Sequence, residues 1–134
     1  MKENKFSDGQ SLIEIIFALV ILSIILTGVV KIVVVSLKNA EFSRYQSVAL
    51  NLAQTKMEQL RSDRDSSSWT AFKEKYINSS PLIESGLGLE GIFQRKTSFL
   101  AEGNDKVKII IEVSWDDSRG THISSISGYL TKWQ

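Results

Sequence analysis

The hydrophobic pattern begins with a short polar segment and then a long apolar run. The run from Ile15 to Val30 has no polar face, so it does not read as the amphipathic helix of a small soluble domain. Its length suits a helix that crosses the roughly 30 Å hydrocarbon core of a bilayer. One acid, Glu14, stands at the start of this run. An ionised carboxylate at membrane depth costs free energy, so we expect a partner to offset that cost.

The apolar helix is expected to continue as an amphipathic helix. No proline or glycine occurs between Ser36 and Arg61, and we predict one helix from Ser11 to about Arg61, ended by the polar segment 62–68. Gly28 costs about 1 kcal/mol relative to alanine inside a helix and is the predicted point of flexibility. The residues that recur at three- and four-residue spacing in the second half are Tyr45, Ala49, Leu52, Ala53, Lys56 and Leu60, with Met57 beside them.

A short aromatic helix is predicted after the polar segment. Ser68 is a suitable N-cap, and the following aromatic residues fall at i, i+3 and i+7 on one face: Trp69, Phe72 and Tyr76. We interpret this stripe as buried against the long helix or a sheet; the alternative is an aromatic patch that binds a ligand. The segment from Pro81 to Gly91 is predicted to be a loop.

Three strands are predicted in the remainder of the chain. Ile92–Leu100 is the first, and the segment from Val107 to Trp115 alternates apolar and mostly polar residues with period two. A loop over 116–120 leads to a return strand over 121–133, whose apolar positions change phase and predict a bulge near Ser124 and Ser125. The expected fold class is α+β, with one long helix laid against a small antiparallel sheet.

Composition excludes several classes of function. The 134 residues carry a net charge of +1, so bulk charge gives no sign of a nucleic-acid partner. The chain has no cysteine and one histidine, which rules out a thiolate nucleophile and disfavours a histidine-based metal site. We find no phosphate loop and no recognisable catalytic set. We therefore predict that the protein is not an enzyme and has no catalytic residue, metal or cofactor.

A few polar and aromatic residues near the C-terminus could suggest binding but have simpler interpretations. Asp116 and Asp117 supply too few oxygen ligands for calcium and suit the chemistry of a hairpin turn. His122 is expected to be a solvated strand residue. Trp115 and Trp133 are expected to pack in the core or hairpin, with an exposed binding role as the alternative.

The N-terminal pattern resembles the class III signal of type IV prepilins and type II secretion pseudopilins. The residues that carry this resemblance are Gly9, Ser11, apolar Leu12 and Ile13, and Glu14 five residues past the glycine. The resemblance implies cleavage between Gly9 and Gln10 by a prepilin peptidase, followed by N-methylation of Gln10. It also implies a leader over 1–9, a transmembrane and filament-core helix over 10–37, an amphipathic continuation over 38–61 and a globular domain over 62–134.

Within a filament, Glu14 is the predicted assembly residue. Its carboxylate can bind the new ammonium at Gln10, in its own chain or in a neighbouring subunit. The alternative is that Glu14 only reaches toward the membrane interface. The resemblance implies that the partners are other major and minor pilins and an inner-membrane assembly platform, and that lipid surrounds the helix before assembly.

The C-terminal half looks like the minor pilins that include pseudopilin I. The segments concerned are Ala49–Leu60, Gln94–Thr97 and Val113–Asp117. This resemblance implies a low-copy subunit that aids filament initiation in a pilus; the alternative is a minor pseudopilin of a type II secretion system. A second alternative is a membrane-anchored binding domain that never polymerises. In each case the leader is expected to be cytoplasmic and the domain extracytoplasmic, ending at the cell surface or in the periplasm for the filament forms.

Overall fold

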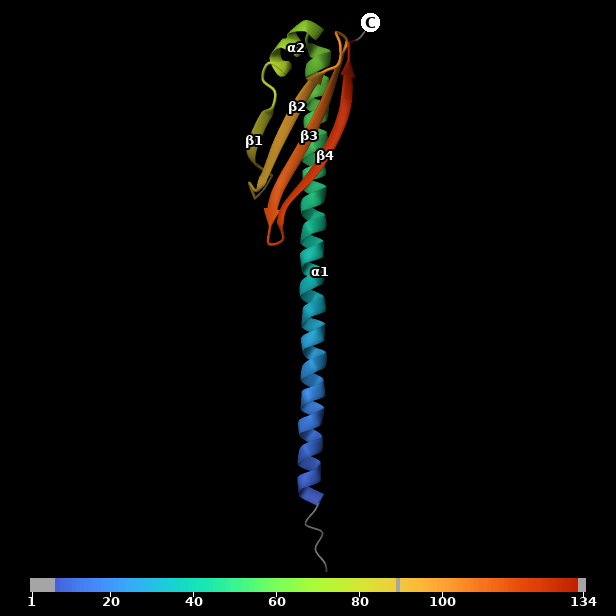
Figure 1. Cartoon of the computed structure of the whole chain (residues 1–134), viewed down its shortest axis with the longest axis vertical. Helices are drawn as coiled ribbons and strands as arrows, with labels where there is room; N and C mark the ends of the chain where they lie inside the picture. The colour runs from blue at the N-terminus through green and yellow to red at the C-terminus, as the bar shows by residue number, and fades with distance from the viewer. Residues whose placement is uncertain (1–6, 89, 133–134) are drawn as a thin grey trace, which may run out of the picture. The chain divides into compact units, whose positions relative to one another are not determined.

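The computed structural model describes residues 7–88 and 90–132, with side chains from Leu12 onward (Figure 1). The elements are α1 (Ser7–Ser66), α2 (Trp69–Ile77), β1 (Leu82–Leu87), β2 (Phe93–Ala101), β3 (Lys106–Asp117) and β4 (Gly120–Thr131). The four strands form one antiparallel sheet in the order β1-β2-β3-β4. The α+β prediction is confirmed, and the arrangement is consistent with the pilin fold.

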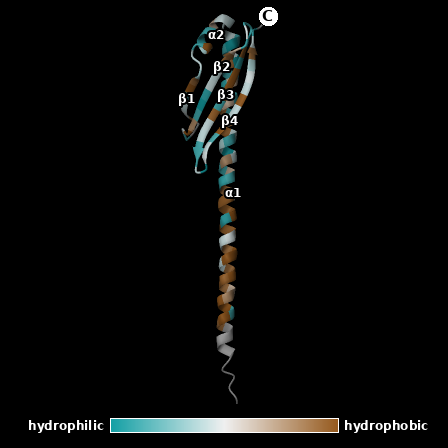
Figure 2. Ribbon diagram, in the orientation of Figure 1, coloured by the Kyte–Doolittle hydropathy of each residue, from teal (hydrophilic) through white to brown (hydrophobic). Residues whose placement is uncertain are grey.

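The chain separates into two compact units within α1, between Phe42 and Ser43. The first unit contains the N-terminal stretch of α1, which is almost uniformly hydrophobic (Figure 2). The second unit contains the rest of α1, α2 and the sheet. We describe each unit separately.

The core of the second unit lies between one face of α1 and one face of the sheet. Residues at three- and four-residue spacing on α1 are buried, which confirms the predicted amphipathic continuation. Every second residue of β3 is also buried, as its alternating pattern predicts. The main members of this core are Ala49, Ala53, Met57, Leu60, Phe72, Phe93, Phe99, Val107, Ile109, Ile111, Val113, Trp115 and Leu130.

The long helix ends later than predicted. It runs to Ser66 rather than Arg61, because the polar segment contains no proline or glycine and its side chains bond locally within the helix. Ser66 Oγ donates to the carbonyl oxygen of Asp63 at 3.3 Å, and Ser67 Oγ, directly after the helix, donates to the same oxygen at 2.6 Å. The carboxylate of Asp63 also accepts a hydrogen bond from the Tyr76 hydroxyl, and this bond is the main reason why the pKa of Asp63 is lowered.

The aromatic helix forms as predicted. Ser68 Oγ accepts a hydrogen bond from the backbone N–H of Ala71 at 3.3 Å, the usual contact of an N-cap. Phe72 and Tyr76 are buried, and the Tyr76 ring stacks on Phe99 of β2 with 5.1 Å between centroids. The prediction of a buried stripe is confirmed for Phe72 and Tyr76. Trp69 is only partly buried, and its Nε1 donates a hydrogen bond to the carbonyl oxygen of Asn104 at 2.7 Å.

The predicted loop between Pro81 and Gly91 contains a strand, β1, that sequence analysis missed. β1 pairs with β2 from Leu82 opposite Thr97 to Leu87 opposite Phe93, with a register shift between Glu84 and Leu87. Its six residues do not alternate clearly between apolar and polar, and glycine follows directly. The pairing surface offered by β2 determines this strand more than its own pattern does.

The predicted bulge in β4 is wrong. Pairing with β3 is continuous from Lys106 opposite Thr131 to Asp117 opposite Gly120, and the hairpin loop is only two residues long. The prediction rested on Ile123 lying on one face of the strand and Ile126 and Leu130 on the other, and it explained the change by a bulge. Its side chain is 66% exposed on the outer face of the sheet, so the inward face keeps one phase along the strand.

The residues near the hairpin behave mostly as predicted. Trp115 is buried, and Asp117 accepts a hydrogen bond from the backbone N–H of Arg119 at 2.7 Å, which confirms its turn role. The prediction that His122 is solvated is wrong. Its side chain is only 25% exposed, its Nε2 lies 2.9 Å from Asp117 Oδ1, and its ring lies against Trp115. Trp133 lies outside the described residues.

We predict that acid weakens the hairpin through Asp117. Burial alone would raise the pKa of Asp117, but the backbone N–H of Arg119 and the side chains of His122 and Arg119 lower it to about 2. Because an unfolded aspartate has a pKa of about 3.9, ionised Asp117 stabilises the fold above about pH 4, and this stabilisation is lost as the pH falls toward about 2. Urea denaturation of Asp117→Asn and wild type should therefore converge between about pH 5 and pH 2.

The control for this acid effect is Glu74→Gln, at an exposed position of α2. Its difference from wild type should stay constant over the same pH range. A constant difference for Asp117→Asn as well would contradict the predicted contribution of Asp117.

A second stability prediction concerns Gly88. Its φ is +77°, and a Cβ built there would lie 2.8 Å from Cδ2 of the buried Phe93 ring. Gly88→Ala should therefore lower the free energy of unfolding by about 2 kcal/mol, through backbone strain and overpacking together. Gly86→Ala is the matched control, since Gly86 has a φ of +73° with no atom near the added Cβ, and should cost about 1 kcal/mol. Equal losses in urea denaturation would contradict the contribution from the Phe93 contact.

Candidate functional site: the apolar segment of α1

The predicted site residues lie at the start of α1. The helix begins at Ser7, so the backbones of Gly9 and Gln10 are helical, whereas their side chains lie outside the described part of the structure. Residues 1–6 of the predicted leader also lie outside it. The cleavage, methylation and assembly roles of Gly9, Gln10 and Glu14 stay predictions.

Glu14 is exposed in an apolar surrounding. Its neighbours Ile13 and Ile15 expose 57% and 58% of their surfaces, and Phe17 exposes 64%. Among the described side chains, none gives the Glu14 carboxylate a hydrogen bond or an ion pair. A carboxylate in this position gains its partner from outside the described chain or stays in contact with water.

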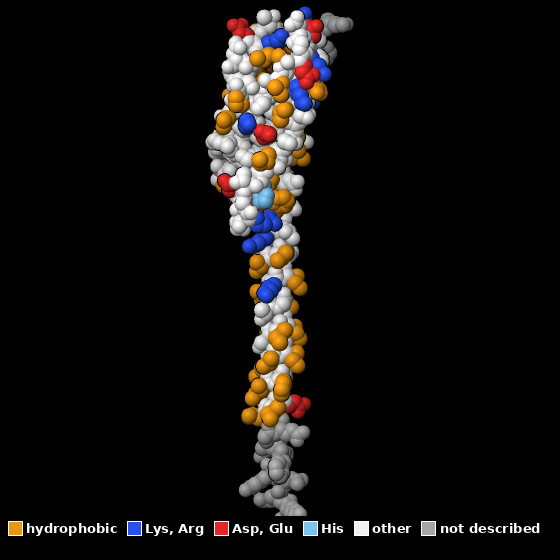
Figure 3. Space-filling model, viewed as in Figure 1, with side chains coloured by type: hydrophobic (Ala, Val, Ile, Leu, Met, Phe, Trp, Pro, Cys, Tyr) orange, Lys and Arg blue, Asp and Glu red, His pale blue; other side chains and the backbone are white. Residues whose placement is uncertain are grey.

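The apolar segment continues around α1 for more than six turns. Between Leu12 and Leu37, the exposure of the large hydrophobic side chains ranges from 45% at Val34 to 71% at Ile32. Figure 3 shows these side chains gathered along the N-terminal stretch of the helix. By length and composition, this part of α1 is apolar enough to cross a membrane. Exposing this apolar surface to water is unfavourable, so the segment requires lipid or other helices around it.

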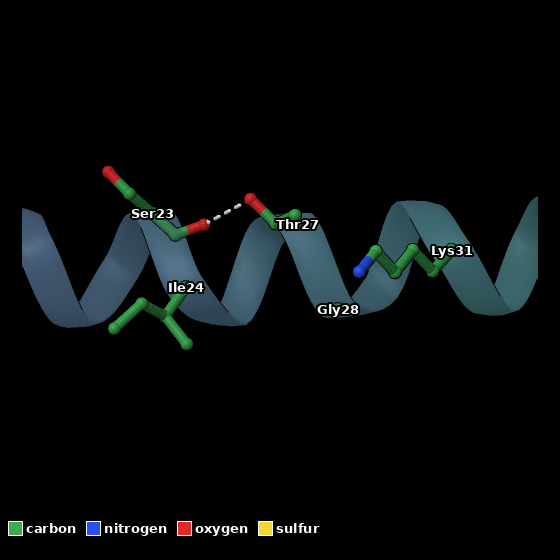
Figure 4. Close-up of a pocket in the computed structure, with 5 residues that line it drawn as sticks. All are labelled: Ser23, Ile24, Thr27, Gly28 and Lys31. Atoms are coloured by element: carbon green, nitrogen blue, oxygen red, sulfur yellow. Dashed lines mark hydrogen bonds between the residues drawn. The ribbon is translucent and has the colours of Figure 1, made fainter.

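A shallow hollow lies on this apolar surface beside two hydroxyl-bearing residues (Figure 4). Ser23 Oγ donates to the carbonyl oxygen of Leu19, and Thr27 Oγ1 donates to that of Ser23, each at 2.8 Å, so both hydroxyls are satisfied within their own helix. Ile24, Gly28 and Lys31 complete the lining, and the hollow is open to its surroundings. The helix runs unbroken through Gly28, and the flexibility there stays a prediction.

Sequence analysis did not assign Lys31 a role in the site. In the sequence, Lys31 is simply the first residue after the uninterrupted apolar run. In the structure, its side chain lies beside Gly28 on a face with Ser23 and Thr27 (Figure 4). The spacing of Ser23, Thr27 and Lys31 by four residues was the signal that could have revealed this face. No group of three or more acidic or histidine side chains is placed to hold a metal ion within the described ranges.

Comparison with protein-family models places a known motif over this segment. Residues 4–30 match the model described as the prokaryotic N-terminal methylation motif. The match includes Gly9, Gln10 and Glu14 and supports a type IV pilin-like protein that is processed by a prepilin peptidase. Comparison with curated proteins and with solved structures gives no match.

Proposed function

We propose that this protein is a minor pilin, a non-enzymatic subunit of a type IV pilus-like filament. The observation that supports this best is an all-round apolar helix with one acid, Glu14, at its start, inside the matched methylation motif. In lipid such a helix is an anchor; beside similar helices it forms a filament core with little change in hydrophobic energy. Polar pairing then sets which helices associate and in what register.

The sequence of events begins with the uncut chain anchored in the membrane, with its leader in the cytoplasm. Prepilin peptidase cuts after Gly9 and methylates the new α-amino group of Gln10. The modified amine keeps a positive charge. It then binds the carboxylate of Glu14, in the same chain or in a neighbour, and this charge-assisted bond favours subunits that carry both groups.

The class of filament rests on the C-terminal half. The proposal of a minor pilin is supported by the sequence resemblance of Val113–Asp117, which forms the end of β3 with Trp115 buried, just before the hairpin. A minor pseudopilin of a type II secretion system is the alternative. Both functions use the same helix, so the binding partners recovered with the protein decide between them.

A membrane-anchored binding domain that never polymerises is the competing function. It needs neither cleavage nor Glu14, whereas a filament subunit needs both. The intact mass of the native protein therefore tests the proposal. We expect a chain of 125 residues, which is the 134-residue sequence without the nine residues before Gln10.

A further inference from the structure

Two charged side chains lie in the apolar stretch of α1 between Leu12 and Leu37, Glu14 and Lys31. Both are exposed, and the described side chains provide neither of them with an ion-pair partner. An unpaired charge in an apolar surrounding costs several kcal/mol when it is fully desolvated. Each of the two therefore requires a partner once the helix leaves the membrane interface and is surrounded by other helices.

The two charges cannot satisfy one another within a single chain. They are 17 residues apart on one continuous helix. At 1.5 Å per residue this separation is about 25 Å along the axis, far beyond the reach of both side chains. Seventeen residues also turn the helix so that the two side chains point roughly 100° apart. Glu14 and Lys31 thus face two different neighbours.

We propose that Lys31 binds Glu14 of a second copy of this chain, packed parallel to the first and displaced along the helix axis by about 25 Å. This inference rests on the proposed filament function, and it places at least two copies of this minor subunit next to one another. Glu14 has two carboxylate oxygens, so it binds Lys31 of one neighbour while it also accepts the ammonium at Gln10.

The hollow beside Lys31 favours a helix as the partner. Gly28 lies three residues before Lys31 and has no side chain, and beyond the adjoining helix backbone and its two chain neighbours no described atom lies within 4 Å of the position a Cβ would take. Small residues allow two helix backbones to approach closely within an apolar surrounding. The hydroxyls of Ser23 and Thr27 are already bonded within the helix, so a neighbour meets no unsatisfied donor there.

A second copy accounts for both charges at once. A lipid phosphate would pair with Lys31 only while the helix lies in the membrane, and it would leave Glu14 with the Gln10 ammonium as its single cation. A parallel, displaced copy pairs each acid with one lysine, and because the acid and the lysine lie on different faces, the contact is heterologous and repeats from copy to copy. Such a contact extends an assembly instead of closing a dimer.

The test is a spacer-free cross-link between an amine and a carboxylate. Mature chains grown with ¹⁴N and ¹⁵N are mixed in detergent, the detergent is removed, and the products are treated with a carbodiimide and digested. We expect a peptide that joins Glu14 of one isotope to Lys31 of the other. An intrachain link is excluded by the distance between the two residues, so the hybrid peptide identifies contact between copies.

Three variants make the test specific. Lys31→Arg keeps the charge but cannot form the cross-link, so assembly should persist without the hybrid peptide. Lys31→Gln should lower the association constant measured by sedimentation about tenfold, the effect of losing one charge-assisted bond of roughly 1.5 kcal/mol. Lys38→Gln, seven residues further along α1, is the control and should assemble and cross-link like wild type.

Sedimentation separates failure of this inference from failure of the proposed function. Assemblies that form normally without the Glu14–Lys31 peptide would overturn the pairing and leave the filament function intact. Mature chains that stay monomeric after detergent removal would overturn both the pairing with a second copy and self-association through α1.

Discussion

Replacing Glu14 with alanine is expected to abolish incorporation of this protein into filaments while leaving removal of the leader intact. The carboxylate is the only acid between Leu12 and Leu37, and it is exposed among apolar side chains. Loss of one charge-assisted bond costs about 1.5 to 3 kcal/mol, or roughly 10- to 100-fold in association, and a subunit in a filament loses this bond at each contact that uses it. Sheared filaments probed for the protein measure the effect.

Two further variants show at which step incorporation fails and whether the effect is specific to Glu14. Gly9→Ala should also abolish incorporation but at an earlier step, so the chain should keep its leader. Glu58→Ala is the control, because the side chain of Glu58 is 68% exposed in the second unit and pairs only with Arg61 among the described residues. Normal filament levels with both Glu14→Ala and Gly9→Ala would contradict the proposed function.

Replacing Glu84 with glutamine is expected to destabilise the globular unit by more than the loss of any exposed ion pair would. Two cations, Lys56 of α1 and Arg95 of β2, are each only 7% exposed and converge on this one carboxylate. Lys56 Nζ lies 3.2 Å from Glu84 Oε1, and Arg95 Nε donates to Oε2 at 2.8 Å. Arg95 also donates to the carbonyl oxygen of Leu52 at 2.9 Å. The cluster therefore links β1, β2 and α1.

The pKa of Glu84 reflects this arrangement. Burial would raise it, but the hydrogen bond and charge of Arg95, followed by those of Lys56, outweigh burial and lower it. Removing the negative charge leaves two buried cations without compensation. For fully buried pairs this costs about 3 to 5 kcal/mol; because the side chain of Glu84 is 31% exposed, we expect about 2 to 3 kcal/mol for Glu84→Gln.

Chemical denaturation of the full chain in detergent, followed by tryptophan fluorescence, measures this loss. Glu58→Gln is the matched control, since it removes an exposed ion pair on the same helix and should change the free energy of unfolding by less than about 0.5 kcal/mol. Similar small losses for both variants would show that the cations find water or other partners when the carboxylate is neutral.

The sequence predicted those elements whose own pattern determines them. The alternation from Val107 to Trp115 identified β3 because every inward position is apolar and buried. The spacing from Ala49 to Leu60 identified the buried face of α1 for the same reason. Ser68 was identified as an N-cap because a serine hydroxyl directly before a helix can accept a hydrogen bond from a backbone N–H of the first turn.

The remainder depends on contacts that one segment cannot reveal. β1 forms because β2 offers it a pairing edge, and its own residues from Leu82 to Leu87 carry no clear period. The part of α1 beyond Arg61 includes Asp63, whose carboxylate accepts a hydrogen bond from Tyr76 of the next helix, a contact that the polar segment alone does not show. The phase of β4 was mispredicted at Ile123, because the sequence does not distinguish an exposed isoleucine from a buried one.

In the candidate site, too, some residues could be predicted from the local sequence and others could not. Gly9, Gln10 and Glu14 could be identified because the signal pattern is local and compact, and residues 4–30 match the corresponding motif. Lys31 could not, because its role in the proposed pairing depends on a second chain. The buried cluster around Glu84 was missed as well, since its three charged residues come from three separate elements.

The most direct test of a processed, filament-forming subunit is the intact mass of the native protein from the cells that make it. We predict a chain of 125 residues that begins at Gln10 and carries one additional methyl group on its α-amino nitrogen. A chain that begins at Met1 and keeps its leader would contradict this account and favour a membrane-anchored domain that does not polymerise.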